Sequence, residues 1–335
     1  MTVSWPERSA YLRPAVLERW DDAALAGWAS AAADAGVTAV LTKLDAITPR
    51  RREVLGSRGM SVIGSFSCYS DHRHPDALPG GVRPVGRDGR ALASMEWYTG
   101  LVPGSDRYDD ALTAQLGAEA AAAETEWVLL DFLRWPGHWE LESRDGASPR
   151  EASFDPLTLT RFAAAQGQAT ASVADVDAHP AEWEAFRTRT ITDRAARLAA
   201  VVREAGARPG MFLVPVEDLR RRRDYGQDAA SLAPHVDLFA LMSYQQMLGL
   251  TADAVLALAD EAAAASERPV VAMLQTSASA EYSDGWDWGP PVTASEAAAL
   301  AAGLDAATRA GRVAGTCFFP GEAPVPHTNT PRGRS

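Results

Sequence analysis

The sequence predicts a (β/α)8 barrel, or TIM barrel, with long βα loops after its third and fourth strands. Short apolar runs recur along the chain, and each is followed by Gly, Pro or polar residues and then by an Ala-rich segment of helical length. This alternation is typical of a parallel sheet with crossover helices. The candidate strands are residues 10–13, 37–43, 61–67, 127–133, 210–216, 238–243, 269–274 and 313–319. In such a barrel, catalytic groups lie at the C-terminal ends of the strands and in the loops that follow them.

Ala-rich segments between these runs supply the crossover helices. The candidate helices are residues 22–35, 111–123, 181–205, 252–265 and 294–310. Roughly sixty residues separate the third strand from the fourth, and more than seventy separate the fourth from the fifth. We expect these two insertions to build the walls of the site, because βα loops surround the C-terminal face. We expect residues 1–322 to form one barrel domain and residues 323–335 to be a disordered tail.

Composition narrows the class of protein. The chain has 335 residues, 47% apolar and 23% charged, which is ordinary for a soluble globular protein. Its net charge of -12 disfavours binding to nucleic acid or to an anionic membrane. We see no run of about 18 apolar residues, no export signal and no disulfide framework from the two cysteines. We therefore expect a cytoplasmic protein with no nucleic-acid or membrane partner, and the oligomeric state stays open.

Carboxylates fall within or just after several of the predicted strands, Asp131 within the fourth, and they are Asp45, Asp71, Asp131, Glu217 and Glu322. Glycosidic cleavage needs two such acids, one to protonate the leaving oxygen and one to attack the sugar or activate water. Asp131 and Glu217 fall on neighbouring strands and could form this pair. Asp131 ends an apolar run and would be costly to bury without a partner, which Arg134 could supply. Glu140, in the loop that follows, either joins Asp131 or faces water.

Aromatic residues gather in the predicted loops at the barrel mouth. They are Trp97, Tyr98, Trp135, Trp139, Trp286 and Trp288. Sugar rings present C–H faces that pack on flat aromatic surfaces, while polar groups bind the hydroxyls. Together these residues favour a carbohydrate-binding pocket.

Other chemistries find less support in the sequence. His72 and His74 form an H-x-H pair, but the later strands end without the further histidines that a metal site in such a barrel requires. We expect no metal, and His72 is interpreted as a polar wall group for a sugar hydroxyl. The chain has no phosphate-binding loop, no G-x-G-x-x-G after a strand and no G-x-S-x-G elbow, so we expect no nucleotide cofactor.

Three segments carry a family resemblance, and they read "LLDFLRWPGHWE" from residue 129, "DYGQD" from residue 224 and "FALMSYQQMLG" from residue 239. Together they resemble the glycoside-hydrolase-like barrel families of bacteria, whose fourth strand reads as an apolar run, Asp, aromatic, Leu or Ile, Arg, aromatic and Pro. The resemblance covers most of the chain. It implies Asp131 and Arg134 at the site, with Asp228, Tyr244 and Gln275 lining it. The strand-seven Glu of the large retaining-glycosidase clan is not matched, because Gln275 stands there.

The leading hypothesis is a glycoside hydrolase with Asp131 as nucleophile or stabilising carboxylate, Glu217 as acid/base and Asp228 as reserve acid. Its substrate would be a soluble oligosaccharide or glycoside. One rival is a non-catalytic carbohydrate-binding barrel, which would lack two acids at working distance. Another is a lyase or isomerase acting on a sugar acid, in which Arg134 would hold the substrate carboxylate and Asp131 or His72 would take a proton.

Overall fold

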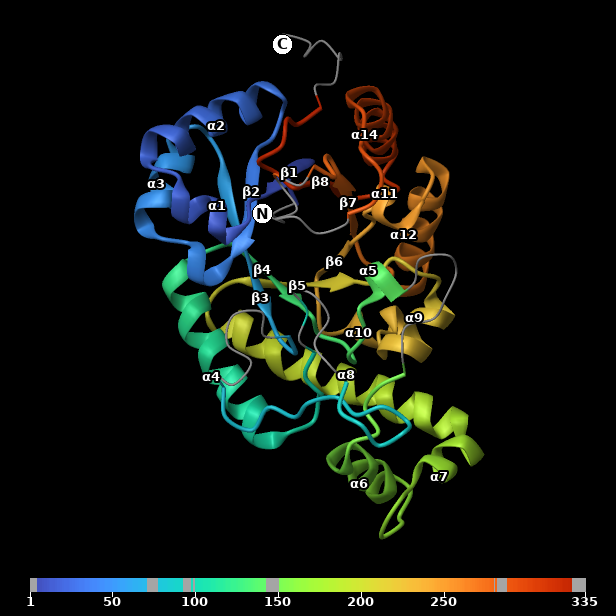
Figure 1. The fold of residues 1–335 in the computed structure, drawn as a ribbon. Helices are drawn as coiled ribbons and strands as arrows, with labels where there is room; N and C mark the ends of the chain where they lie inside the picture. Colours follow the sequence, from blue (N-terminus) through green and yellow to red (C-terminus); the bar gives the residue numbers. More distant parts are fainter. Residues whose placement is uncertain are drawn as a thin grey trace.

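The computed structural model of the protein describes residues 5–70, 78–92, 98, 100–142, 151–279, 281 and 288–326. Eight parallel strands close into a barrel in sequence order, and the last strand pairs back to the first (Figure 1). The strands are β1 (Arg8–Tyr11), β2 (Ala39–Lys43), β3 (Ser61–Ser67), β4 (Trp127–Asp131), β5 (Arg208–Leu213), β6 (Leu238–Leu241), β7 (Val270–Gln275) and β8 (Gly315–Phe319). The predicted (β/α)8 barrel is confirmed.

Most strand boundaries differ from the prediction by one to three residues, and the C-terminal ends of β1 and β5 show physical reasons for the difference. Strand β1 ends at Tyr11, two residues before the predicted end. The N–H of Leu12 still donates to the carbonyl of Leu41, and Pro14, which has no N–H to donate, then begins helix α1. Strand β5 ends at Leu213, because the N–H of Val214 is bound by the side chain of Gln227 at 3.0 Å and not by a neighbouring strand. The barrel's strands are therefore short, and side chains secure their ends.

Helices surround the barrel on its outside (Figure 1). The helices along the first half of the chain are α1 (Pro14–Arg19), α2 (Asp22–Asp34), the 3-10 turn η1 (Leu44–Ala46), α3 (Pro49–Gly56), α4 (Asp106–Ala123), α5 (Trp139–Glu142) and α6 (Pro156–Ala165). Those that follow are α7 (Val173–Ala178), α8 (Pro180–Glu204), α9 (Asp218–Tyr225), α10 (Ala229–Leu232), α11 (Gln245–Leu248), α12 (Ala252–Ser266) and α14 (Ala294–Arg309). All five predicted helices are present. Helix α4 begins five residues before its predicted start because Ser105 caps it, accepting a hydrogen bond from the N–H of Tyr108.

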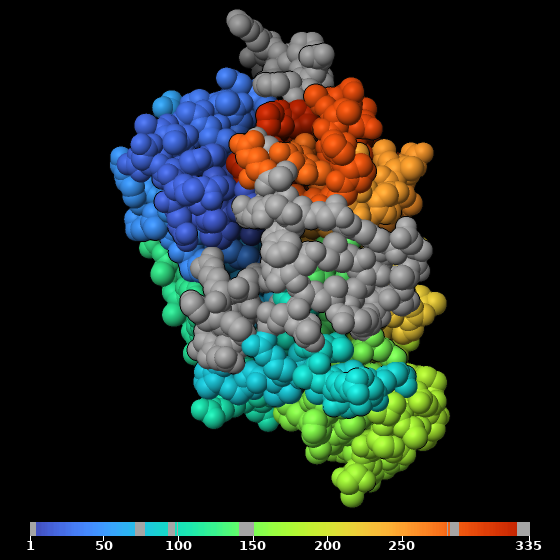
Figure 2. All heavy atoms as spheres, viewed as in Figure 1, coloured from blue at the N-terminus to red at the C-terminus, as the bar shows by residue number. Residues whose placement is uncertain are grey.

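The two long insertions pack on each other outside the barrel. Phe154, Phe162, Val176 and Trp183 form a small apolar cluster between α6, α7 and α8. The N–H of Phe154 donates to the carbonyl of Val85 at 2.9 Å, so the insertion after β4 is joined to the insertion after β3. In the space-filling view the two insertions lie against each other, cyan beside yellow-green (Figure 2).

The C-terminal segment is partly described. Ala323 is buried, and the carbonyl of Pro326 accepts a hydrogen bond from the Arg8 guanidinium at 3.2 Å. These residues belong to the predicted tail and pack against the body of the protein, whereas residues 327–335 lie outside the described part. Within the described ranges, no helix is both long and apolar enough to cross a lipid bilayer.

Candidate active site

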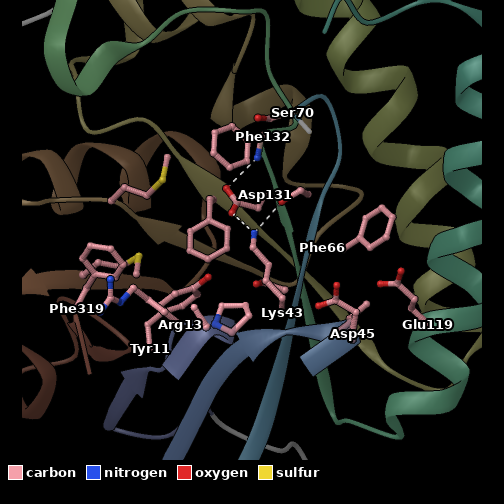
Figure 3. Close-up of a pocket in the computed structure, with 18 of the residues that line it drawn as sticks. Tyr11, Arg13, Lys43, Asp45, Phe66, Ser70, Glu119, Asp131, Phe132 and Phe319 are labelled. Carbon is pink, nitrogen blue, oxygen red and sulfur yellow. Dashed lines mark hydrogen bonds and ion pairs between the residues drawn. The ribbon is translucent and has the colours of Figure 1, made fainter. Parts of the chain in front are cut away.

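The candidate site is a cavity of about 610 Å³ at the C-terminal ends of the strands (Figure 3). Side chains along a barrel strand alternate between the interior and the surrounding helices. Leu41 and Leu129 belong to the inward set and are fully buried in the barrel core. Lys43 and Asp131 each lie two residues further along the same strands, so they point into the cavity.

Asp131 and Lys43 form an ion pair in the middle of this cavity. The Nζ of Lys43 lies 2.6 Å from Oδ2 of Asp131 and 2.9 Å from the hydroxyl of Ser67. Ser67 is the partner of Asp131 in the pairing of β3 with β4, so the three groups converge from three adjacent strands. The other carboxylate oxygen, Oδ1, accepts from the N–H of Phe132 at 2.9 Å. Donors on both oxygens suit an ionised carboxylate.

The charges of this pair also act on Tyr11 at the end of β1. Burial lowers the pKa of Lys43, but the Asp131 carboxylate, Tyr11 and the hydrogen bond to Asp131 outweigh it, and the net pKa is raised. Burial raises the pKa of the Tyr11 phenol, with Lys43 opposing the shift and Asp131 adding to it. At neutral pH the cavity therefore holds an ammonium cation beside a protonated phenol.

Glu140 places another buried carboxylate on the cavity wall. It lies in α5, and its Oε2 is 3.3 Å from Nδ1 of His138. Burial raises the pKa of the Tyr244 phenol well above its usual value, and the carboxylates of Asp131 and then Glu140 add to that shift. Asp131, Glu140 and Tyr244 all line the same cavity.

Aromatic rings form one side of the cavity. Phe319 contacts three of them, with centroid distances of 4.7 Å to Tyr244, 5.0 Å to Trp288 and 5.5 Å to Tyr11. Trp139 stacks on the far side of this group, 5.9 Å from Tyr244. Tyr11 and Phe319 end β1 and β8, Tyr244 lies between β6 and α11, Trp139 begins α5, and Trp288 lies in the segment between β7 and α14. They offer the flat apolar surface on which the C–H face of a sugar ring packs.

Phe132 holds the chain in an unusual conformation next to Asp131. Its φ of +51° lies in the left-handed region, which costs a non-glycine residue about 1 kcal/mol or more. The Phe132 ring stacks on Tyr98 at 5.8 Å, with the Arg134 guanidinium 5.3 Å from its centroid. This packing fixes the turn that aims the Phe132 N–H at Asp131.

The structure does not bring Glu217 and Asp228 together with Asp131. Glu217 is exposed and precedes α9, and it does not line the cavity. Asp228 precedes α10, accepts a hydrogen bond from Ser231, and lines a separate surface pocket beside α8. Strand β5 ends before either residue, so the chain has already left the barrel when it reaches them. Neither is therefore part of the pair that we propose below.

Arg134 and Trp135 lie behind the cavity wall and not on it. The Arg134 guanidinium donates to the carbonyl of Gly137 at 2.5 Å and is surrounded by the rings of Tyr98, Phe132 and Tyr225. The Trp135 indole N–H donates to the carbonyl of Arg187 at 3.0 Å, on α8. Both predicted substrate-binding residues are buried and support the loop after β4, as does Tyr98.

Other predicted wall residues divide into lining and supporting groups. Tyr244 and Trp288 line the cavity, and their binding of substrate stays a prediction. Gln275 is fully buried, and its amide donates to the carbonyl of Trp288 at 2.8 Å and accepts from the N–H of Met247 at 3.1 Å. Gln275 therefore positions Trp288. Trp139 supports Tyr244 by stacking. His72, Trp97 and Trp286 lie outside the described residues.

Lys43, Tyr11 and Phe319 line the cavity but are not among the site residues predicted from the sequence. Lys43 carried a signal that could have identified it, because it is the single lysine of a chain that has 31 arginines. Tyr11 and Phe319 are the inward residues at strand ends, and the alternation of each strand would have found them. Among the described residues no three His, Cys, Asp or Glu side chains are grouped to hold a metal ion.

Comparison with solved structures finds glycoside hydrolases with the same fold. The catalytic domain of beta-amylase from Paenibacillus polymyxa matches with a TM-score of 0.63 at 10% identity, over 97% of this chain and 96% of that one. A beta-galactosidase from the psychrophilic Marinomonas ef1 matches with a TM-score of 0.64 at 12% identity, over 93% of this chain and 54% of that one. The GH5_18 protein from Streptomyces cattleya matches with a TM-score of 0.52 at 13% identity, over 95% and 71%.

These likenesses show the fold, since identities this low carry no activity from one protein to another. The chain spans nearly all of the beta-amylase domain and about half of the beta-galactosidase. No family model matches the chain, and no curated protein matches it by sequence. The resemblance to the bacterial barrel families therefore stays a prediction, within a fold that glycoside hydrolases use.

Proposed function

We propose that the protein is a glycoside hydrolase that cleaves a soluble oligosaccharide or glycoside with the carboxylates of Asp131 and Glu140. The observation that carries the proposal is the Asp131–Lys43 ion pair, 2.6 Å long, beneath an aromatic wall in a cavity of sugar size. Cleavage of a glycosidic bond passes through a cationic, oxocarbenium-like transition state, which an ionised carboxylate below the ring stabilises.

The surroundings of the two acids give them different roles. Asp131 receives the Lys43 ammonium on one oxygen and a backbone N–H on the other, so it serves as the nucleophile or as the base that activates water. Glu140 is enclosed beside the Trp139–Tyr244 stack, with His138 at 3.3 Å, and serves as the proton donor to the leaving oxygen.

The charges in the cavity favour a neutral sugar over a sugar acid. Both cations that line the described cavity are already paired, Lys43 with Asp131 and Arg13 with Glu322. Arg134, which a sugar-acid lyase or isomerase would need for the substrate carboxylate, is buried behind Phe132. The cavity therefore offers an anionic ring little compensation for its lost hydration.

The test of the two roles uses a panel of 4-nitrophenyl glycosides and the matching 2,4-dinitrophenyl glycosides. On the responsive sugar we expect Glu140→Gln to lower kcat/KM by about 10²- to 10⁴-fold with the poorer leaving group, which must be protonated. The loss should be much smaller with 2,4-dinitrophenolate, which leaves without a proton. Glu126→Gln, at the opposite end of β4 and exposed, is the matched control and should behave as wild type. Equal losses with both leaving groups would exclude Glu140 as the proton donor.

A further inference from the structure

Ser65 places a buried hydroxyl on the wall of the cavity. It is 1% exposed, and its Oγ has no hydrogen-bond partner among the described residues. Ser65 is the partner of Lys43 in the pairing of β2 with β3, so it lies beside the foot of the lysine that holds Asp131. A buried hydroxyl without a partner loses its hydration and gains nothing in return, so such groups in native proteins call for an explanation.

Lys43, next to Ser65, has one N–H donor that its hydrogen bonds to Asp131 and Ser67 do not use. An ammonium group has three N–H donors, and those of Lys43 serve Asp131 and Ser67. The third N–H is without an acceptor in the described part of the protein, while the side chain lines the cavity. Arginine is used everywhere else in the chain. The planar guanidinium fork cannot direct three donors from one atom, so this position calls for lysine.

We propose that Ser65 and the third N–H of Lys43 bind a ring hydroxyl of the sugar that sits over Asp131. The inference rests on the proposed function and narrows its substrate class to neutral glycosides that carry this hydroxyl. The two groups are complementary, because Lys43 can only donate, whereas the Ser65 hydroxyl can donate or accept. A sugar hydroxyl has both a proton and lone pairs and satisfies the two groups together.

This contact discriminates among substrates because two protein groups lose their partner when the sugar hydroxyl is absent. A substrate that lacks the hydroxyl would leave the Ser65 Oγ and the third Lys43 N–H buried without a partner. Sites built to bind a substrate hydroxyl reject analogues that lack it much more strongly than apolar pockets reject small changes in size. The aromatic rings around Phe319 accept many sugars, whereas Ser65 and Lys43 select among them.

The experiment measures kcat/KM for the responsive 4-nitrophenyl glycoside and for its 2-, 3-, 4- and 6-deoxy analogues. Wild type and Ser65→Ala are compared on each substrate, and their unfolding temperatures confirm that both are folded. We expect wild type to prefer the parent over one deoxy analogue by a factor that Ser65→Ala reduces about tenfold. At the other ring positions the two enzymes should show the same preference. If Ser65→Ala leaves the preference unchanged at every position, the inference is overturned.

Thr42→Val is the matched control. Thr42 is also buried, and its hydroxyl also lacks a hydrogen-bond partner in the described residues. It precedes Lys43 on β2, so its side chain belongs to the other face of the strand, and it does not line the cavity. Thr42→Val should keep the wild-type preferences, since it removes the same kind of hydroxyl outside the cavity.

A separate readout distinguishes failure of this inference from failure of the proposed function. If wild type hydrolyses none of the glycosides, the proposed function fails. Binding of free glucose, galactose, mannose and their deoxy analogues, measured by calorimetry, then tests Ser65 without turnover. Binding that Ser65→Ala weakens for one parent sugar but not for its deoxy analogue supports the inference. Binding that shows no such difference contradicts it.

Discussion

Lys43 is unusual both in the sequence and in the candidate site. It is the only lysine among 32 Lys and Arg residues, and it lies 2.6 Å from Asp131 at the centre of the barrel. The compact ammonium fits between Asp131 and Ser67, where a guanidinium would need more room. A single residue of this type makes the pair accessible to direct measurement.

Lysine labelled with ¹³C at Cε should therefore give one resonance, whose shift reports the titration of Lys43. We expect the midpoint to lie above the ordinary lysine value of about 10.4, because Asp131 favours the charged form. Asp131→Asn removes that charge and leaves the burial, which favours the neutral amine, so the midpoint should fall. A midpoint that does not move between wild type and Asp131→Asn would contradict the ion pair.

The residues at and after the end of β4 differ in how far their positions can be predicted from the sequence. The sequence predicts that Asp131 is paired or functional, because an acid at the end of a buried strand is costly to leave alone. The predicted partner, Arg134, was wrong, since Lys43 forms the ion pair. Trp135 and Arg134 could not be placed, since the alternation that orients strand residues ends with β4. The left-handed turn at Phe132 then directs Trp135 towards α8. Glu140 stayed open in the sequence for the same reason, as it lies in a short helix beyond that turn.

The "GQD" segment, residues 226–228, joins the C-terminal ends of strands β4 and β5 through its glutamine. Gln227 is buried, and its side-chain amide donates to the carbonyls of Phe212 at 3.0 Å and Leu133 at 3.3 Å. Its oxygen accepts from the N–H of Val214 at 3.0 Å. One side chain thus joins the ends of two strands. The sequence resemblance pointed to Asp228, but the contacts with the barrel are made by its neighbour.

Replacing Gln227 by Ala should destabilise this junction. The change leaves two carbonyls and one N–H without their buried partner, so we expect the free energy of unfolding to fall by about 2–4 kcal/mol. Chemical denaturation measures this loss, and Gln168→Ala, at an exposed glutamine after α6, is the matched control. A loss below about 0.5 kcal/mol for Gln227→Ala would show that the junction does not depend on this side chain.

At the scale of the whole molecule, the barrel was predictable and its insertions were not. Eight apolar runs with helical segments between them define a closed parallel sheet, because a strand buried on both faces leaves a continuous apolar run. The insertions after β3 and β4 lack such a period. Their packing depends on contacts between segments far apart in sequence, such as the bond from Phe154 to Val85. The sequence predicts that these insertions lie at the mouth of the barrel. Which of their side chains line the cavity can be seen only in the structure.

The proposed hydrolysis requires Asp131 to act on the sugar as an ionised carboxylate, and kcat/KM of Asp131→Asn on the responsive glycoside measures this requirement. We predict a loss of about 10³-fold or more, because the amide has nearly the same shape but cannot stabilise the cationic transition state. Asp110→Asn, on the exposed face of α4, is the matched control and should retain wild-type activity. A folded Asp131→Asn variant that hydrolyses the glycoside within about tenfold of wild type would contradict the account.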